Sequence, residues 1–357
     1  MELNVVTKSY INAKAEIPVA VSIEDAIIEN AVVEDFELPP TDISREQFIY
    51  ANTVGVTPVD LKTGCIIPVF SKDNESTISH TEFVEITNEV AGRFFKGERL
   101  LQPSIRVSHP IKGRIPEAMG KPAKELKESE KTLFWERCAF VIELPGITET
   151  ISGNSLTLTI GGVRAYNHEN LYNKKSEEKF KIFIGFKNTV CCNLCIFTNG
   201  SFREIRVRTM HELAIEIYNM ISAFEPYRQM QTLQNFQNYS LSESQFAHLL
   251  GKARMYQHLP NSIKKDLQQF PLSDTQVSTV AGEYYHDKAF SRDENGSIDL
   301  WKMYNLFTGA NKSSYIDTFL DRGAQCYSFT KFLTSQIDSG SRSWYLGDGN
   351  IYVKSYD

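Results

Sequence analysis

The chain has 357 residues, of which 41% are hydrophobic and 11% aromatic, and its formal net charge is −6. This length suits one large domain or two ordinary ones, and the composition is typical of a protein with a sizeable core. No run reaches the ~18 apolar residues of a membrane span, and the first residues lack the features of a signal peptide, so we expect a cytoplasmic protein without a membrane partner.

The charge is unevenly distributed along the chain. Residues 1–46 hold ten acidic and three basic residues, a net charge of −7, which leaves +1 for the rest of the chain. We predict a loosely docked acidic arm over 1–45 that is joined to the body near Thr41. Two interpretations stay open, because such an arm is either solvated disorder or a cover for a basic face that competes with a polyanion.

Strand signals are densest in the middle of the chain, where β-branched and aromatic residues accumulate. Gly153-Asn154 and Asn199-Gly200 are residue pairs typical of hairpin turns. After Thr209, which we interpret as an N-cap, apolar residues recur with helical spacing as far as Phe224. The pattern predicts an antiparallel meander that packs beneath a helix, with strands at 132–144, 154–166, 179–186, 190–197 and 202–207.

The flanking regions predict further elements. A strand is expected at 65–70, and a helix at 79–95 is expected to begin with a capping box formed by Ser79 and Glu82. The remainder is predicted to be mostly helical, with helices at 241–256 after a Ser240 cap, 273–286, 299–307 and 314–323. The predicted fold class is α+β, with an acidic arm at 1–45, a core domain at 46–225, a helical lobe at 226–334 and a tail at 335–357.

Residues 96–131 are rich in lysine and arginine and are interrupted by prolines and glycines. One interpretation is a solvated connector. The other is a phosphate-contacting loop laid on the meander, in which basic side chains supply charge and Gly113 allows close backbone approach. The residues predicted to bind nucleic acid in this loop are Arg106, His109, Lys112 and Arg114.

A second polar cluster follows the glycine pair Gly161-Gly162. It is either a tight β-loop whose side chains bond their own backbone or a ligand loop. In the second case arginine would bind phosphate and tyrosine would stack on bases. The residues predicted to bind there are Arg164, Tyr166, Asn167, His168 and Tyr172.

Other motifs favour structural interpretations. The segment from Thr308 to Ser314 lacks the glycine spacing and preceding strand of a phosphate loop, so we interpret it as an interhelical turn, with Lys312 kept as a candidate phosphate contact. Cys192 and Cys195 have redox-motif spacing but lie in a predicted strand, and no second Cys or His pair completes a zinc site, so we expect buried reduced thiols. No catalytic constellation is complete, which favours a non-enzyme without metal or cofactor.

Five runs carry a resemblance to a known family: residues 66–75, 105–118, 158–172, 183–188 and 305–322. They resemble an uncharacterised family of Bacteroidetes mobile elements, the domain-of-unknown-function family numbered thirty-eight seventy-one. The chain is more distantly similar to the phage/plasmid-like family numbered nine thirty-two. The resemblance covers roughly residues 45–325 and implies a phage, plasmid or integrated element, and hence DNA maintenance or conflict with host defences, without implying any catalytic residue.

A meander that runs into a helix is also the core arrangement of single-strand annealing proteins of the RecT and Red-beta type, although a fold does not fix a function. Our first hypothesis is a mobile-element accessory protein that binds single-stranded DNA or assists annealing and that can form a homo-oligomer. The alternative is an acidic inhibitor that binds a host defence or replication protein.

Overall fold

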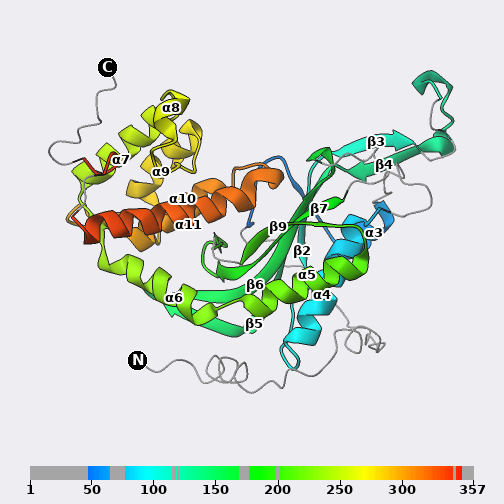
Figure 1. Cartoon of the computed structure of the whole chain (residues 1–357), viewed down its shortest axis with the longest axis horizontal. Coiled ribbons are helices and arrows are strands. Elements are labelled where there is room, and N and C mark those ends of the chain that lie inside the picture. Colours follow the sequence, from blue (N-terminus) through cyan, green and yellow to red (C-terminus); the bar gives the residue numbers. More distant parts are fainter. Residues whose placement is uncertain are drawn as a thin grey trace.

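The computed structural model describes residues 47–64, 77–114, 118, 121–168, 177–197, 201–340 and 343–347. The acidic arm, the strand expected at 65–70, Asn199-Gly200 and Tyr172 lie outside these residues. The described chain confirms an α+β fold, because helices pack against a curled antiparallel sheet (Figure 1). None of the described helices combines the length and the apolar character needed to cross a bilayer.

The main sheet has the order β1-β2-β5-β6-β7-β8, and β9 also pairs with β7. Its long central strands are joined by a tight turn in which Ser152 and Gly153 have φ values of +48° and +76°. Asn154 already pairs with Ile151, so the turn residues lie one position earlier than the Gly153-Asn154 pair indicates. The strands are β1 (Val54–Val56), β2 (Ser104–Val107), β5 (Arg137–Ile151), β6 (Asn154–Ala165), β7 (Glu178–Asn188), β8 (Leu194–Cys195) and β9 (Phe202–Val207).

Two helices cover one face of this sheet. Helix α4 (His80–Phe94) begins at the predicted capping box, and α5 (Met210–Ala223) begins after the predicted Thr209 cap. They pack on each other and on β6 and β7 (Figure 1). The Gly161-Gly162 pair belongs to this packing, since a Cβ on Gly162 would lie 2.4 Å from the ring of Phe83.

The other face is covered by α11 (Ile316–Asp338), which packs on β5, β6 and β8. Phe319 and Leu320 of α11 join Val141 and Val163 of the sheet in a second apolar cluster. Covering on both faces explains why β6 and β7 are buried almost along their whole length.

Apart from α3 (Pro58–Gly64), which precedes α4, the remaining helices lie in the region predicted to be helical. Ser242, not Ser240, caps α7, because Ser240 and Leu241 form the short strand β10 instead. The helix expected at 314–323 runs on as α11 to Asp338, so regular structure continues past the predicted boundary at 334. The elements are α3 (Pro58–Gly64), α6 (Pro226–Asn235), η5 (Phe236–Asn238), β10 (Ser240–Leu241), α7 (Glu243–Tyr256), α8 (Asn261–Lys264), α9 (Asp274–His286), β11 (Ile298–Asp299) and α10 (Leu300–Asn311).

Two of the expected strands differ from the structure. The run predicted at 132–144 bends at Glu136, so its first part leaves the main sheet as β4 (Lys131–Trp135) and pairs only with β3 (Pro110–Arg114). Of the run predicted at 190–197, only Leu194 and Cys195 pair as a strand. Cys192 has a φ of +56°, which interrupts extended backbone there.

Candidate nucleic-acid interface

The ribbon formed by β3 and β4 projects from one end of the main sheet (Figure 1). It contains most of the basic segment predicted from the sequence, and we name it the β3–β4 arm (residues 110–135). Between its strands the chain forms two short turns of 3-10 helix, η2 (Ala123–Glu125) and η3 (Glu128–Glu130). The basic segment is therefore mainly an ordered ribbon rather than a loop laid over the meander.

One face of the arm packs toward the body. Ile111 stands opposite Phe134 in the register, and Phe134 is buried with its ring centroid 5.8 Å from that of Tyr166. The carbonyl of Trp135 accepts a hydrogen bond at 2.9 Å from Nε2 of His80, which must carry the proton there because a carbonyl only accepts. These contacts fix the base of the arm to β6 and α4.

The opposite face of the arm is directed away from those contacts. Directly opposed residues of an antiparallel pair share a face, and the register pairs Pro110 with Trp135, Lys112 with Leu133 and Arg114 with Lys131. Lys112 and Lys131 are exposed and Leu133 is 48% exposed, whereas Trp135 is half-buried and also packs against the main core. Basic and apolar side chains are thus interleaved on one surface, which we name the outward face.

The far end of the arm adds exposed cations. Lys121 and Lys131 form ion pairs of 2.5 Å with Glu130 and Glu128, and these lysines lower the pKa of both carboxyls. Lys124 and Lys127 are exposed, and in the described chain neither forms an ion pair, nor does Lys112. These three ammonium groups have no described ion pair to break before an external anion binds, although Lys112 and Lys127 also lower the pKa of Glu128 and Glu130.

The residues at the base of the arm have mixed surroundings. Arg106 is half-buried on β2, where its Nε donates to Thr53 Oγ1 at 3.0 Å and its Nη2 donates to the Thr53 carbonyl at 2.7 Å. Burial lowers its pKa from the ordinary value. Arg106 therefore holds the segment before β1, whereas His109 is exposed where the arm begins.

Arg164 and Tyr166 are buried, so the surface roles predicted for them do not fit the structure. Arg164 is 1% exposed, and its Nη2 lies 2.5 Å from Oε2 of Glu178. Its guanidinium also lies 4.5 Å from the ring centroid of Tyr166 and 4.4 Å from that of Phe180. In this arrangement phosphate cannot reach Arg164 and a base cannot stack on Tyr166, because protein atoms already occupy both positions.

The other predicted residues divide between two places. Asn167 and His168 are exposed at the end of β6, and His168 Nε2 lies 3.0 Å from Oδ2 of Asp317 on α11. Lys312 lies apart from the arm, buried between the carbonyl of Cys191 and the ring of Tyr50. The structure thus gathers Arg106, His109, Lys112, Arg164, Tyr166, Asn167 and His168 at one end of the sheet, with Arg114 on the arm by register, and excludes Lys312.

In the described residues no cluster of three His, Cys, Asp or Glu side chains is arranged to hold an ion. Cys192 and Cys195 are buried. Burial raises the pKa of Cys191 to about 12 and that of Cys195 still higher. Cys191 and Cys195 are therefore protonated at neutral pH.

Sequence reasoning missed the contributions of Trp135, Leu133, Lys124 and Lys127. The signal for the first two was the alternation Lys131-Thr132-Leu133-Phe134-Trp135, which the prediction assigned to a longer strand of the central sheet. Only the bend at Glu136 separates this segment from the sheet and turns one of its faces outward.

The chain matches the model of one protein family over residues 26–346. That family is described as "Domain of unknown function, B. Theta Gene description (DUF3871)". No curated protein and no solved structure matches the chain.

Proposed function

Because the chain belongs to this domain-of-unknown-function family, whose description names no activity, we propose a function from the geometry: the protein binds single-stranded nucleic acid through the outward face of its β3–β4 arm. The observation that carries the proposal is the register of the arm, which places Lys112, Arg114 and Lys131 on the same face as Leu133 and Trp135.

That combination suits single strands. Cations follow the phosphate backbone, while an indole offers a flat surface on which a base stacks irrespective of its identity. An unstacked strand exposes bases and phosphates together, so interleaved apolar and basic groups contact both. A duplex hides its base faces, so the same surface would reach only its phosphates and would bind it less tightly.

The modest charge of the arm sets the expected strength. Lys112, Lys124 and Lys127 have no ion pair in the described chain, and Arg114 stands opposite Lys131 in the register. If all four neutralise phosphates, log K falls with log salt with a slope of about −2.8, since each contact on a single strand contributes about −0.7. Affinity should then fall about 50-fold between 50 and 200 mM salt.

The test compares two double charge reversals with the same change in net charge. Lys112→Glu/Lys124→Glu alters the arm, whereas Lys265→Glu/Lys288→Glu alters exposed lysines on the helical lobe that have no ion pair in the described chain. Anisotropy of a labelled single-stranded oligonucleotide should show the arm variant losing affinity and about half of the salt slope, while the lobe variant binds like the parent. Equal effects of the two variants would refute an arm-specific site.

Stacking is tested separately by intrinsic fluorescence. Trp135 is one of three tryptophans, and Trp301 is fully buried. Binding of a single strand should quench emission, and most of the quenching should disappear in Trp135→Phe while much of the affinity remains. Quenching that persists in this variant would place the bound strand elsewhere.

The mobile-element setting and the relation to the phage/plasmid-like family belong to the same proposal, since a single-strand binding or annealing accessory suits an element that moves through single-stranded intermediates. If the protein binds none of the oligonucleotides although the arm is folded, this result would favour the alternative, an inhibitor that binds a host protein.

A further inference from the structure

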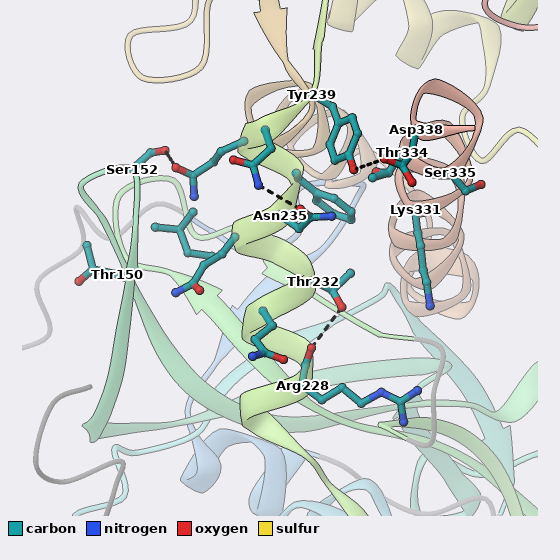
Figure 2. Close-up of a pocket in the computed structure, with 16 residues that line it drawn as sticks. Thr150, Ser152, Arg228, Thr232, Asn235, Tyr239, Lys331, Thr334, Ser335 and Asp338 are labelled. Atoms are coloured by element: carbon teal, nitrogen blue, oxygen red, sulfur yellow. Dashed lines mark hydrogen bonds between the residues drawn. The ribbon is translucent and has the colours of Figure 1, made fainter. Parts of the chain in front are cut away.

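A groove lined mostly by polar residues lies beside the β5–β6 turn, at the opposite end of β5 from the β3–β4 arm. Figure 2 shows the residues that line it. Its floor is one side of α6 and η5, and its walls are the β5–β6 turn around Ser152 and the last turns of α11. The cavity measures about 820 Å³, which is within the roughly 300–1,000 Å³ of small-molecule sites.

One end of the groove is cationic. Arg228 of α6 and Lys331 of α11 lie on facing elements at this end (Figure 2), and both side chains are exposed. The only ion pair recorded for Arg228 in the described chain is a 3.4 Å contact with Glu225, and both partners are more than 60% exposed, so water screens it strongly. Lys331 has no ion pair in the described residues. Two converging cations, one of them a planar guanidinium, form a site for a phosphate group.

The middle of the groove is lined by carboxamides. The side-chain amides of Gln231 and Gln234 make no hydrogen bond to any other described residue, whereas Asn235 accepts from Asn238 at 3.0 Å and Gln237 accepts from Ser152 at 2.7 Å. A carboxamide donates and accepts side by side, which matches the edge of a nucleobase. Free carboxamides facing a groove are therefore suited to a ring with alternating donors and acceptors.

The other end is acidic. Asp338, the last residue of α11, accepts a hydrogen bond from the Tyr239 hydroxyl at 3.2 Å, as Figure 2 shows. A carboxylate oxygen remaining there can accept from an exocyclic amino group of a base. Arg228 and Asn238 are ten residues apart, so the floor extends about 15 Å along the helix axis.

From this order of groups we infer that the groove binds a mononucleotide, with its phosphate between Arg228 and Lys331, its base against the free glutamine amides and toward Asp338, and its ribose between the phosphate and the base. The site does not depend on the function proposed for the arm, because the two lie at opposite ends of β5 and share no residue.

Isothermal titration of the full-length protein tests the inference with four nucleoside monophosphates, adenosine, glucose 6-phosphate and inorganic phosphate as probes. At least one monophosphate should bind at least tenfold more tightly than the other three classes of probe. The inference is overturned if no monophosphate binds, or if inorganic phosphate or glucose 6-phosphate binds as tightly.

Variants then locate the site. Arg228→Gln/Lys331→Gln should weaken nucleotide binding at least tenfold, while Lys265→Gln/Lys288→Gln, with the same loss of charge, should leave it unchanged. Gln231→Leu/Gln234→Leu should reduce the preference for a nucleotide over phosphate. Retained binding in the first variant overturns the assignment. The arm variant Lys112→Glu/Lys124→Glu should still bind the nucleotide, which separates failure of this site from failure of the arm.

Discussion

Mutation of the buried pair Arg164 and Glu178 tests whether Arg164 has a structural role or binds nucleic acid. The Arg164 side chain is fully buried and that of Glu178 is 4% exposed. The carboxylate of Glu178 also accepts the amide of Ile78 at 3.1 and 3.3 Å, just before the cap of α4. The pair therefore joins β6 and β7 to the start of the helix that covers them.

Arg164→Met keeps much of the aliphatic volume but leaves the charge of Glu178 buried without its cation. Breaking a buried pair in this way typically costs about 3–5 kcal/mol, whereas replacing both partners by neutral groups is often close to neutral. Arg164→Met/Glu178→Gln retains an acceptor for the Ile78 amide, so we expect it to recover at least about 2 kcal/mol of the loss.

Urea unfolding followed by circular dichroism measures both variants and the Glu178→Gln single, which completes a double-mutant cycle. Oligonucleotide affinity is measured in parallel, under conditions where each variant is folded. The reasoning is refuted if Arg164→Met lowers the free energy of unfolding by less than about 1 kcal/mol, or if it abolishes oligonucleotide binding while stability is unchanged. The latter result would restore Arg164 as a phosphate contact.

Three further predictions concern the interior and the helix caps. Burial, with a smaller contribution from the charge of Arg164, lowers the pKa of His80 from 6.5 to about 3. As the pH falls, the unfolded chain therefore takes up this proton before the folded chain does, and the free energy of unfolding should fall by about 2 kcal/mol from pH 7 to pH 5. In His80→Gln, urea unfolding at the two pH values should show a smaller fall. Ser242→Ala should lower the thermal midpoint through a loss of about 1 kcal/mol at the cap of α7, whereas Ser240→Ala should leave it nearly unchanged; the opposite order would support the cap predicted from the sequence. Because burial raises the pKa of Cys191 and Cys195, both thiols should react with a disulfide reagent far more slowly in native than in urea-unfolded protein, and fast native labelling would contradict their burial.

Local patterns in the sequence predicted most of the secondary structure. The capping box at Ser79, the Thr209 cap and the alternation in 154–166 each act through neighbouring residues, so the elements they predict are found in the structure with ends that differ by only a few residues. The glycine pair at 161–162 shows the limit of such patterns. It resembles a loop signal, yet Gly162 makes room for the ring of Phe83, which comes from a helix about 80 residues earlier, and Gly161 makes room for the Phe140 carbonyl and the Phe183 ring.

The candidate site depended on information that the sequence does not contain locally. The sequence shows that a side chain is basic but not whether it pairs with a distant carboxylate or faces solvent. Arg164 and Lys112 were therefore equal candidates for binding phosphate. The structure separates them, because Arg164 pairs with Glu178 whereas Lys112 lies on the outward face of the arm. The sequence by itself determined the α+β class, most helix starts and the presence of a basic segment, because these follow from propensity, capping and composition. Only the tertiary structure decided which cations stay accessible, because burial and ion pairing are set by which strands and helices meet.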